Sequence, residues 1–231
     1  DAAYVAVADA VKDGKVGRPT SIRATFRDHP GPPAAFLANA GGNIFHDLAT
    51  HDIDYVLALV KDVFPPDTTT HHHPDEVWAF GSSSTSELRA KGVFDAATIV
   101  LKWKRGDLIE LCATLDLARG STYGYDQRIE VFGTSGSSIA VDNPASTPVR
   151  IADRSGLHAP PHVHSFPQRF DDAFAAELDH FLDCVDQRAV PRVTVHDAYL
   201  ATVVAEAALQ SANHDTVVKL RRADDDVILH Y

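Results

Sequence analysis

Four strand-like segments follow one another in the middle of the chain, and their order constrains the fold more than any other feature. Apolar runs of strand length occupy residues 77–82, 97–103, 108–115 and 128–132. Gly106-Asp107 separates the second run from the third, and this dipeptide is typical of a tight hairpin turn. Because a hairpin joins antiparallel neighbours, we expect a mainly antiparallel sheet rather than alternating βαβ units.

Helical periodicity precedes and follows these strands. Apolar residues recur every three or four positions in four segments, which are 2–12, 44–63, 170–185 and 195–212. One more strand is expected at 21–27, and shorter runs are candidates for further or edge strands at 138–141, 149–152, 217–220 and 227–231. The sequence therefore predicts a single α+β domain over residues 1–231, and we find no internal repeat in it.

The net charge limits the kinds of partner that the chain can bind, and the cysteine content indicates its cellular compartment. The formal net charge of −11 opposes binding to nucleic acid or to an anionic membrane surface, since both need clustered Lys and Arg. We therefore expect a small molecule or a second copy of the chain as partner. Two cysteines, Cys112 and Cys184, are too few for a disulfide framework. We expect both to be buried thiols in a reducing, cytoplasmic compartment.

The stretch Gly41–Tyr55, GGNIFHDLATHDIDY, holds the candidate chemistry. On a helix Asp47 and His51 are four residues apart and share one face, which Asp54 continues. A carboxylate beside an imidazole can orient the ring and stabilise its cation, as a general base requires. The spacing alone is more typical of a solvated helix face with a structural ion pair than of an active site.

The residues around this pair resemble a known signature. Gly41-Gly42 followed by Phe45, Asp47, His51 and Asp52-x-Asp54 resembles that of the glucose–fructose oxidoreductase, inositol dehydrogenase and rhizopine-catabolism family. The resemblance spans nearly the whole chain, in order, through further segments: Gly14–Pro19, Tyr123–Gly133 with Glu130 in place, Arg169–Val185 and Pro191–Ser211. Each segment alone resembles the family only modestly, but the segments together are specific to it.

The resemblance implies a fold and a reaction. The family's C-terminal domain, which resembles that of dihydrodipicolinate reductase, is an open antiparallel sheet with helices on one face. Its other face often makes subunit contacts, so a homo-oligomer is expected. By resemblance His51 is the general base and Asp47 its positioning carboxylate in the oxidation of a secondary alcohol on a cyclic polyol or sugar. By the same resemblance the substrate pocket is lined by Asp54, Asn43, Tyr123 and Tyr125.

Two features of the family are missing from this sequence. No Glu-Lys-Pro motif, which carries the family's catalytic Lys, occurs here, and no Gly-x-Gly-x-x-Gly follows a strand and opens a helix. We therefore expect no cofactor-binding residues in this chain. NAD or NADP would be bound mainly by a Rossmann domain upstream of Asp1 in a longer parent protein. The chain also contains no methionine, and alone we expect it to be inactive.

Two rival interpretations are a metal-binding protein and a domain without catalytic activity. His71–His73 stands in a Thr-rich segment predicted to be a surface loop, and Pro residues crowd His162 and His164. His46 and His51 lie about 140° apart around a helix, so they would not converge on one ion. We expect no metal site, and a metal-dependent hydrolase is the weaker rival. The stronger rival is a non-catalytic sheet domain for self-association or ligand binding.

Overall fold

The computed structural model describes residues 1–37, 43–63, 72–223 and 226–230. The predicted Gly41-Gly42 turn lies outside the described residues, as does His71. Within the described part of the chain, no helix is long and apolar enough to cross a membrane.

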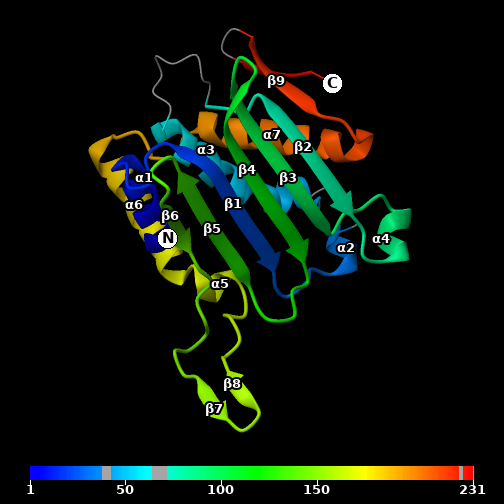
Figure 1. Ribbon diagram of the computed structural model, residues 1–231, viewed down its shortest axis with the longest axis vertical. Helices are drawn as coiled ribbons and strands as arrows, with labels where there is room; N and C mark the ends of the chain where they lie inside the picture. The colour runs from blue at the N-terminus through cyan, green and yellow to red at the C-terminus, as the bar shows by residue number, and fades with distance from the viewer. Residues whose placement is uncertain (38–42, 64–71, 224–225, 231) are drawn as a thin grey trace.

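One twisted sheet of eight strands forms the centre of the molecule (Figure 1). Its order is β10-β9-β2-β3-β4-β1-β5-β6, with all neighbours antiparallel except the parallel pair β1 and β4. The strands are β1 (Pro19–Asp28), β2 (Glu76–Ser82), β3 (Ala96–Arg105), β4 (Leu108–Arg119), β5 (Asp126–Gly133), β6 (Ser138–Val141), β9 (Val218–Ala223) and β10 (Asp226–His230).

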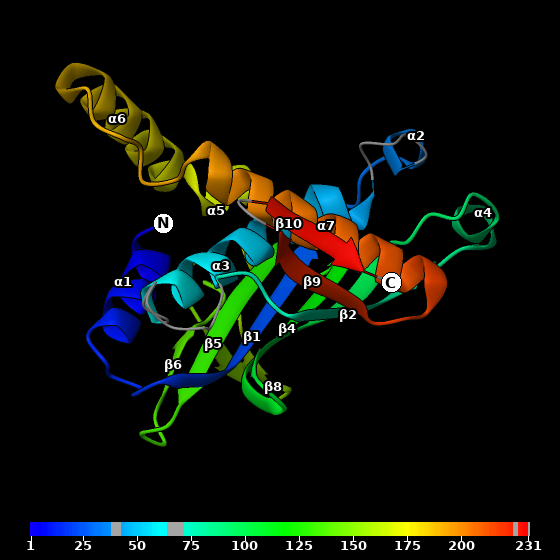
Figure 2. The same ribbon diagram turned by 90° about the horizontal axis from the view of Figure 1, so that it is seen from above.

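Helices cover one face of this sheet and leave the other face open (Figure 2). Three of them, α1 (Ala2–Lys12), α3 (Thr50–Val63) and α7 (Val195–His214), contact strands of the sheet or each other. The remaining helical segments are α2 (Ala34–Leu37), the π-helical turn η2 (Phe45–Ala49), α4 (Ser86–Ala90), α5 (Phe166–Arg169) and α6 (Asp171–Gln187). The predicted α+β class, with an open and mainly antiparallel sheet and helices on one face, is confirmed.

The core lies between the sheet and these helices. In β3 the alternate residues Ile99, Leu101 and Trp103 are fully buried, because a strand sends every second side chain to the same face. Helix α7 presents Ala205 and Ala208, both fully buried, and such small side chains let a helix approach a sheet closely. Each large apolar side chain buried in this way stabilises the fold by roughly 1.5–3 kcal/mol.

Local predictions are largely confirmed. The hairpin at Gly106-Asp107 joins β3 and β4, and the terminal segments form β9 and β10 at the sheet edge. Thr194 caps α7 through a capping box, in which its hydroxyl accepts from the Asp197 N–H while Asp197 accepts from the Thr194 N–H.

Three local predictions are corrected. The run at 149–152 does not join the main sheet, because β7 (Ile151–Asp153) pairs only with β8 (Gly156–His158) in a separate exposed ribbon (Figure 1). His73, predicted to lie in a surface loop, is buried where its segment passes over Trp103, whose Nε1–H donates to the His72 carbonyl. Cys112 is half-buried on the open face of β4, although Cys184 is buried and both thiols are free.

Candidate active site

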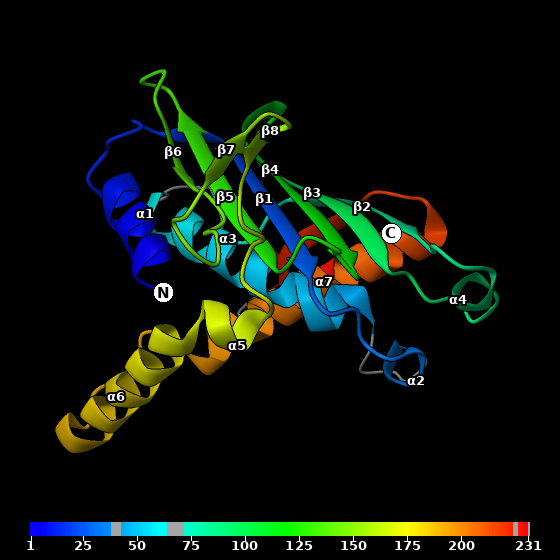
Figure 3. The same cartoon turned by 90° about the horizontal axis from the view of Figure 1, so that it is seen from below.

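A cavity of about 670 Å³ opens where the ends of β1 and β5 meet the first turns of α3 and the base of α6. Figure 3 shows these elements from below, with α5 and α6 on the same side as the N-terminus. The walls of the cavity are aromatic and acidic. The aromatic residues that line it are Tyr4, Phe26, Tyr55, Tyr125, Phe166, Phe170 and Phe174. The acidic ones are Asp1, Asp28, Asp47, Asp52 and Glu177, and the predicted base His51 lines it as well.

The helix that carries Asp47 and His51 does not start as a regular α-helix. Asn43 caps it, since its Oδ1 accepts a hydrogen bond from the Phe45 N–H at 2.8 Å. The following turn, η2, is π-helical, a widened turn that often occurs at functional sites. Asp47 lies in this widened turn and His51 in the first turn of α3, and both line the cavity. Asn43 serves as the cap and is not among the cavity-lining residues.

Asp47 has a partner that the sequence did not indicate. Arg119 Nη2, at the end of β4, donates to Asp47 Oδ2 at 2.5 Å, and Arg119 Nη1 lies 3.8 Å from Asp28 Oδ2. The Arg119 side chain is 3% exposed, so its charge is poorly screened by water. Burial raises the pKa of Asp28, the Arg119 guanidinium opposes this rise, and the Asp47 charge adds to it. One cation thus holds two carboxylates at the edge of the cavity.

His51 is exposed at the cavity wall, with its ring edge-on to Phe26 at a centroid distance of 6.3 Å. Asp54, on the next turn of α3, is half-buried and is not among the cavity-lining residues. Burial and the nearby Asp197 raise the pKa of Asp54, while His51 and Lys61 act in the opposite direction. His51 therefore has an acidic neighbour on its own helix and an aromatic support from β1.

A buried hydrogen-bond chain crosses the inner wall of the cavity. The Tyr125 hydroxyl donates to Gln127 Oε1 at 3.0 Å, and Gln127 Nε2 donates to Asp52 Oδ1 at 3.1 Å. Asp52 is 4% exposed, and its Oδ2 has no hydrogen-bond partner among the described residues. Burial raises the pKa of Asp52 to about 7, although the hydrogen bond from Gln127 lowers it. The predicted pocket residue Tyr125 is thus fixed by Gln127, which the sequence did not single out, and through Gln127 it is linked to Asp52 of the signature segment.

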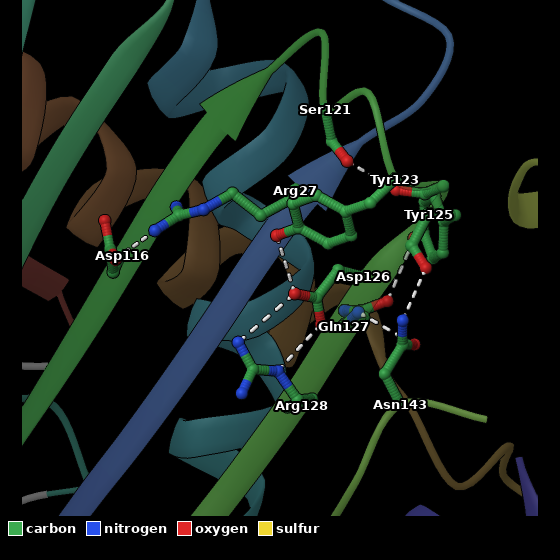
Figure 4. A network of polar contacts seen from close by, with 10 residues as sticks. Arg27, Asp116, Ser121, Tyr123, Tyr125, Asp126, Gln127, Arg128 and Asn143 are labelled. Carbon is green, nitrogen blue, oxygen red and sulfur yellow. Dashed lines mark hydrogen bonds and ion pairs between the residues drawn. The ribbon is translucent and has the colours of Figure 1, made fainter. Parts of the chain in front are cut away.

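The predicted pocket residue Tyr123 lies in a neighbouring, more polar hollow of about 390 Å³. Its hydroxyl donates to Asp126 Oδ2 at 2.9 Å, and Arg128 Nε donates to the other oxygen of the same carboxylate at 2.8 Å (Figure 4). Gly124 separates the two tyrosines with φ of +109°, and a Cβ there would lie 2.9 Å from the Val163 carbonyl oxygen. Glycine at this position allows Tyr123 and Tyr125 to enter different hollows.

Among the residues that the structure describes, the histidines do not assemble into a metal site. No group of three or more His, Cys, Asp or Glu side chains in the described ranges could hold a metal ion. His46 Nε2 lies 3.1 Å from Glu206 Oε2 on α7, away from the cavity that His51 lines. His162 and His164 make ring contacts with Tyr123 and His29, respectively.

Sequence reasoning missed Arg119, Asp28 and Gln127. Arg119 and Asp28 are paired in the parallel register of β1 and β4, a pairing that local patterns do not reveal. The sequence did contain a signal that Gln127 belongs near the pocket. It follows Tyr125 at the two-residue spacing that places both side chains on one face of a strand.

Comparison with known proteins places the chain in a family. Residues 8–220 match the family described as "Oxidoreductase family, C-terminal alpha/beta domain". The chain belongs to this family. It is 34% identical over 213 residues to the myo-inositol 2-dehydrogenase of Thermotoga maritima, covering 92% of this chain and 59% of the relative. It is 29% identical over 220 residues to the scyllo-inositol 2-dehydrogenase (NAD(+)) of Bacillus subtilis, with 95% and 60% covered.

A solved structure agrees with this membership. A probable dehydrogenase from Thermotoga maritima superposes with a TM-score of 0.83 at 30% identity, covering 95% of this chain and 61% of that one. This member of the oxidoreductase family therefore spans about three-fifths of the length of its relatives. Its predicted resemblance to inositol dehydrogenases is confirmed.

Proposed function

We propose that the chain is the substrate-facing domain of an NAD- or NADP-dependent dehydrogenase that oxidises a secondary alcohol of a cyclic polyol or sugar. The observation that carries this proposal is the convergence of His51 and Asp47 on one acidic and aromatic cavity. Relatives named as inositol 2-dehydrogenases, one of them with NAD(+), support the substrate class and the cofactor.

The lining of the cavity suits a neutral, hydroxyl-rich ligand. Ionised carboxylates only accept hydrogen bonds, and polyol hydroxyls are donors that can satisfy them. Asp28 and Asp47 both line the cavity, where they would also disfavour an anionic substrate. The aromatic walls offer flat apolar surface to the C–H faces of a ring.

In the proposed reaction the chain handles the proton. His51 accepts the hydroxyl proton as the carbinol C–H bond breaks, so that the alcohol becomes a ketone. A nicotinamide nucleotide, when bound, supplies the acceptor for the hydride that leaves this carbon. Asp47, held by Arg119, keeps a fixed negative charge at the same wall of the cavity, where it stabilises the cation that forms on His51.

The nucleotide does not fit this chain alone. A pyrophosphate needs a glycine-rich turn at the start of a helix, and the sequence contains no such motif. We propose that a Rossmann domain upstream of Asp1 in the parent protein binds it. Both cysteines are free, in keeping with the reducing cytoplasm, where we propose the enzyme works.

The test uses the longer gene product and follows nucleotide reduction with myo-inositol, scyllo-inositol and simple sugars. His51→Ala should lower kcat by about 10²–10⁴-fold, the usual contribution of a general base. His46→Ala is the matched control, because His46 contacts Glu206 and should leave kcat within about twofold. Equal activity of His51→Ala and the unmodified protein would reject the assignment.

We also propose that the open face of the sheet joins two copies of the parent protein. Trp78 and Phe80, alternate residues of β2 on this face, are 38% and 42% exposed and their rings lie 4.6 Å apart. Such an exposed aromatic pair is typical of an interface. Sedimentation of Trp78→Glu should show a lighter species than the unmodified protein; an unchanged mass would exclude this face.

A further inference from the structure

The Tyr125 ring is held in one position at the inner wall of the cavity, where it is 2% exposed. Phe26 and Phe170 contact it edge-on, with ring centroids 5.3 and 5.9 Å away. Its backbone N–H donates to the Val163 carbonyl at 2.9 Å. Its carbonyl accepts from Asn143 Nδ2 at 2.7 Å (Figure 4). Because ring and backbone are fixed, the direction of the O–H bond is what remains to be set.

Gln127 sets this direction. Gln127 Oε1 lies 3.0 Å from the Tyr125 hydroxyl, and an amide oxygen only accepts hydrogen bonds, so Tyr125 donates to it. Asn143 Oδ1 accepts from the Gln127 N–H at 3.4 Å and so holds the backbone of Gln127 as well. The phenol proton is therefore used within the wall. To a ligand in the cavity, the Tyr125 oxygen offers only its lone pairs.

Asp52 in turn sets the orientation of the Gln127 amide, because Gln127 Nε2 donates to Asp52 Oδ1 at 3.1 Å. In the reversed amide Gln127 Oε1 would face Asp52 Oδ1, and two buried acceptors would oppose each other. Protonation of Asp52 does not require this reversal. Asp52 Oδ2 has no hydrogen-bond partner among the described residues, so it can carry the proton while Oδ1 still accepts. The hydrogen-bond chain keeps one direction in both charge states of Asp52.

We infer that Asp52 and Gln127 are positioning residues that make Tyr125 a hydrogen-bond acceptor toward the cavity, so that this wall selects a substrate hydroxyl over a carbonyl, an ether or a fluorine. The inference deepens the proposed function and rests on it. A hydroxyl can donate to Tyr125, whereas the other three groups only accept. The selected hydroxyl is not the one that is oxidised, because the proposed reaction moves that proton to His51 and leaves a carbonyl.

The binding test uses myo-inositol and its monofluoro analogues, in which fluorine replaces one hydroxyl at a time. Calorimetry gives Kd for the longer gene product with reduced nucleotide bound, so that no turnover occurs. At one ring position, other than the oxidised one, fluorine should raise Kd at least about tenfold, because the Tyr125 oxygen then lacks a donor. In Gln127→Met the same analogue should differ from myo-inositol by less than about threefold, because Tyr125 is free to turn its proton toward the ligand.

Gln127→Glu is the matched control. A carboxylic acid at this position accepts from Tyr125 with one oxygen and donates to Asp52 with the other, so the preference for the hydroxyl should remain. Asp52→Leu is a second, independent test. It removes the acceptor for the Gln127 amide, which can then reverse, and the preference should fall as in Gln127→Met.

A second measurement needs no ligand. The NMR shift of Tyr125 Cζ in the 231-residue chain follows the hydrogen bond of the phenol. It should move in Gln127→Met and in Asp52→Leu and stay in place in Gln127→Glu. A purely structural role of Gln127 and Asp52 would leave this shift unchanged in folded variants.

Three results would overturn the inference. The first is that the unmodified protein shows no preference for a hydroxyl over fluorine at any ring position. The second is that Gln127→Met keeps the full preference. The third is an unchanged Cζ shift in both Gln127→Met and Asp52→Leu. Binding of myo-inositol with this preference, but without nucleotide reduction, would instead support the inference and reject the proposed function.

Discussion

Asp28 and Arg119 are register partners in the parallel pair of β1 and β4, and their side chains approach to 3.8 Å at the edge of the sheet. From this position the guanidinium also reaches Asp47 on the π-helical turn at 2.5 Å. A strand pairing between distant segments therefore fixes the carboxylate that we propose to stabilise the charge on His51.

Replacement of Arg119 should disturb two carboxylates at once. In Arg119→Ala the pKa of Asp28 should rise further, because the cation that lowers it is lost while burial and Asp47 remain. We expect a loss of about 3 kcal/mol in the free energy of unfolding, as for other buried ion pairs that lose one partner. NMR titration of the carboxyl carbons and urea unfolding measure the two effects. Arg23→Ala, an exposed arginine on β1, should change neither.

Asp52 should make stability fall as the pH rises. Its pKa is about 7 in the folded chain, against an ordinary value of 3.8 for this carboxyl, so the folded state holds this proton more tightly. Its stabilising contribution is complete below about pH 4 and is lost as the pH rises through 7. Asp52→Asn removes this dependence, and its unfolding free energy should exceed that of the unmodified chain at pH 8 by no more than about 4 kcal/mol. Equal slopes between pH 4 and 8 in both proteins would contradict the assignment.

Gly133 should tolerate no side chain. A Cβ at this position would lie 2.3 Å from the Val16 carbonyl oxygen and 2.8 Å from that of Arg18, both backbone atoms. We expect Gly133→Ala to cost about 3 kcal/mol or more, because the backbone of one segment has to move. Gly136 lies in the same turn, and a Cβ there would meet no atom within 4 Å. The only cost of Gly136→Ala is therefore the strain of a side chain at a φ of +78°. It should cost about 1 kcal/mol in thermal or urea unfolding, the usual penalty of a left-handed residue.

The capping box of α7 should contribute measurably to stability. Thr194→Ala removes the hydroxyl that accepts from the Asp197 N–H at 3.3 Å and that donates to the Asp197 carboxylate at 2.6 Å. We expect a loss of about 1 kcal/mol in urea unfolding at pH 7. Thr202→Ala is the control on the same helix, since Thr202 is exposed and its hydroxyl bonds only to the Ala198 carbonyl one turn back. An equal loss in both variants would show that the cap has no special role.

Residue periodicity and turn chemistry were enough to predict most elements of the fold. The two-residue spacing of Ile99, Leu101 and Trp103 indicates a strand with one buried face, and Gly106-Asp107 fixes its antiparallel neighbour. Both signals are local, so they can be recognised without knowledge of the partner. Motif resemblance added the family, and it drew attention to His51 and Asp47.

The remaining features depend on contacts between distant segments. Asp28 meets Arg119 only because β1 pairs in parallel with β4, and the Asp52–Gln127 bond joins α3 to β5. The apolar face of α6 is visible in the sequence, but its exposure is not, since periodicity identifies a face and never names what covers it. The sequence therefore determined the elements, their apolar faces and the chemical groups. Only the tertiary structure decided which of those groups share a cavity, because strand pairing and helix packing bring together residues far apart in the chain.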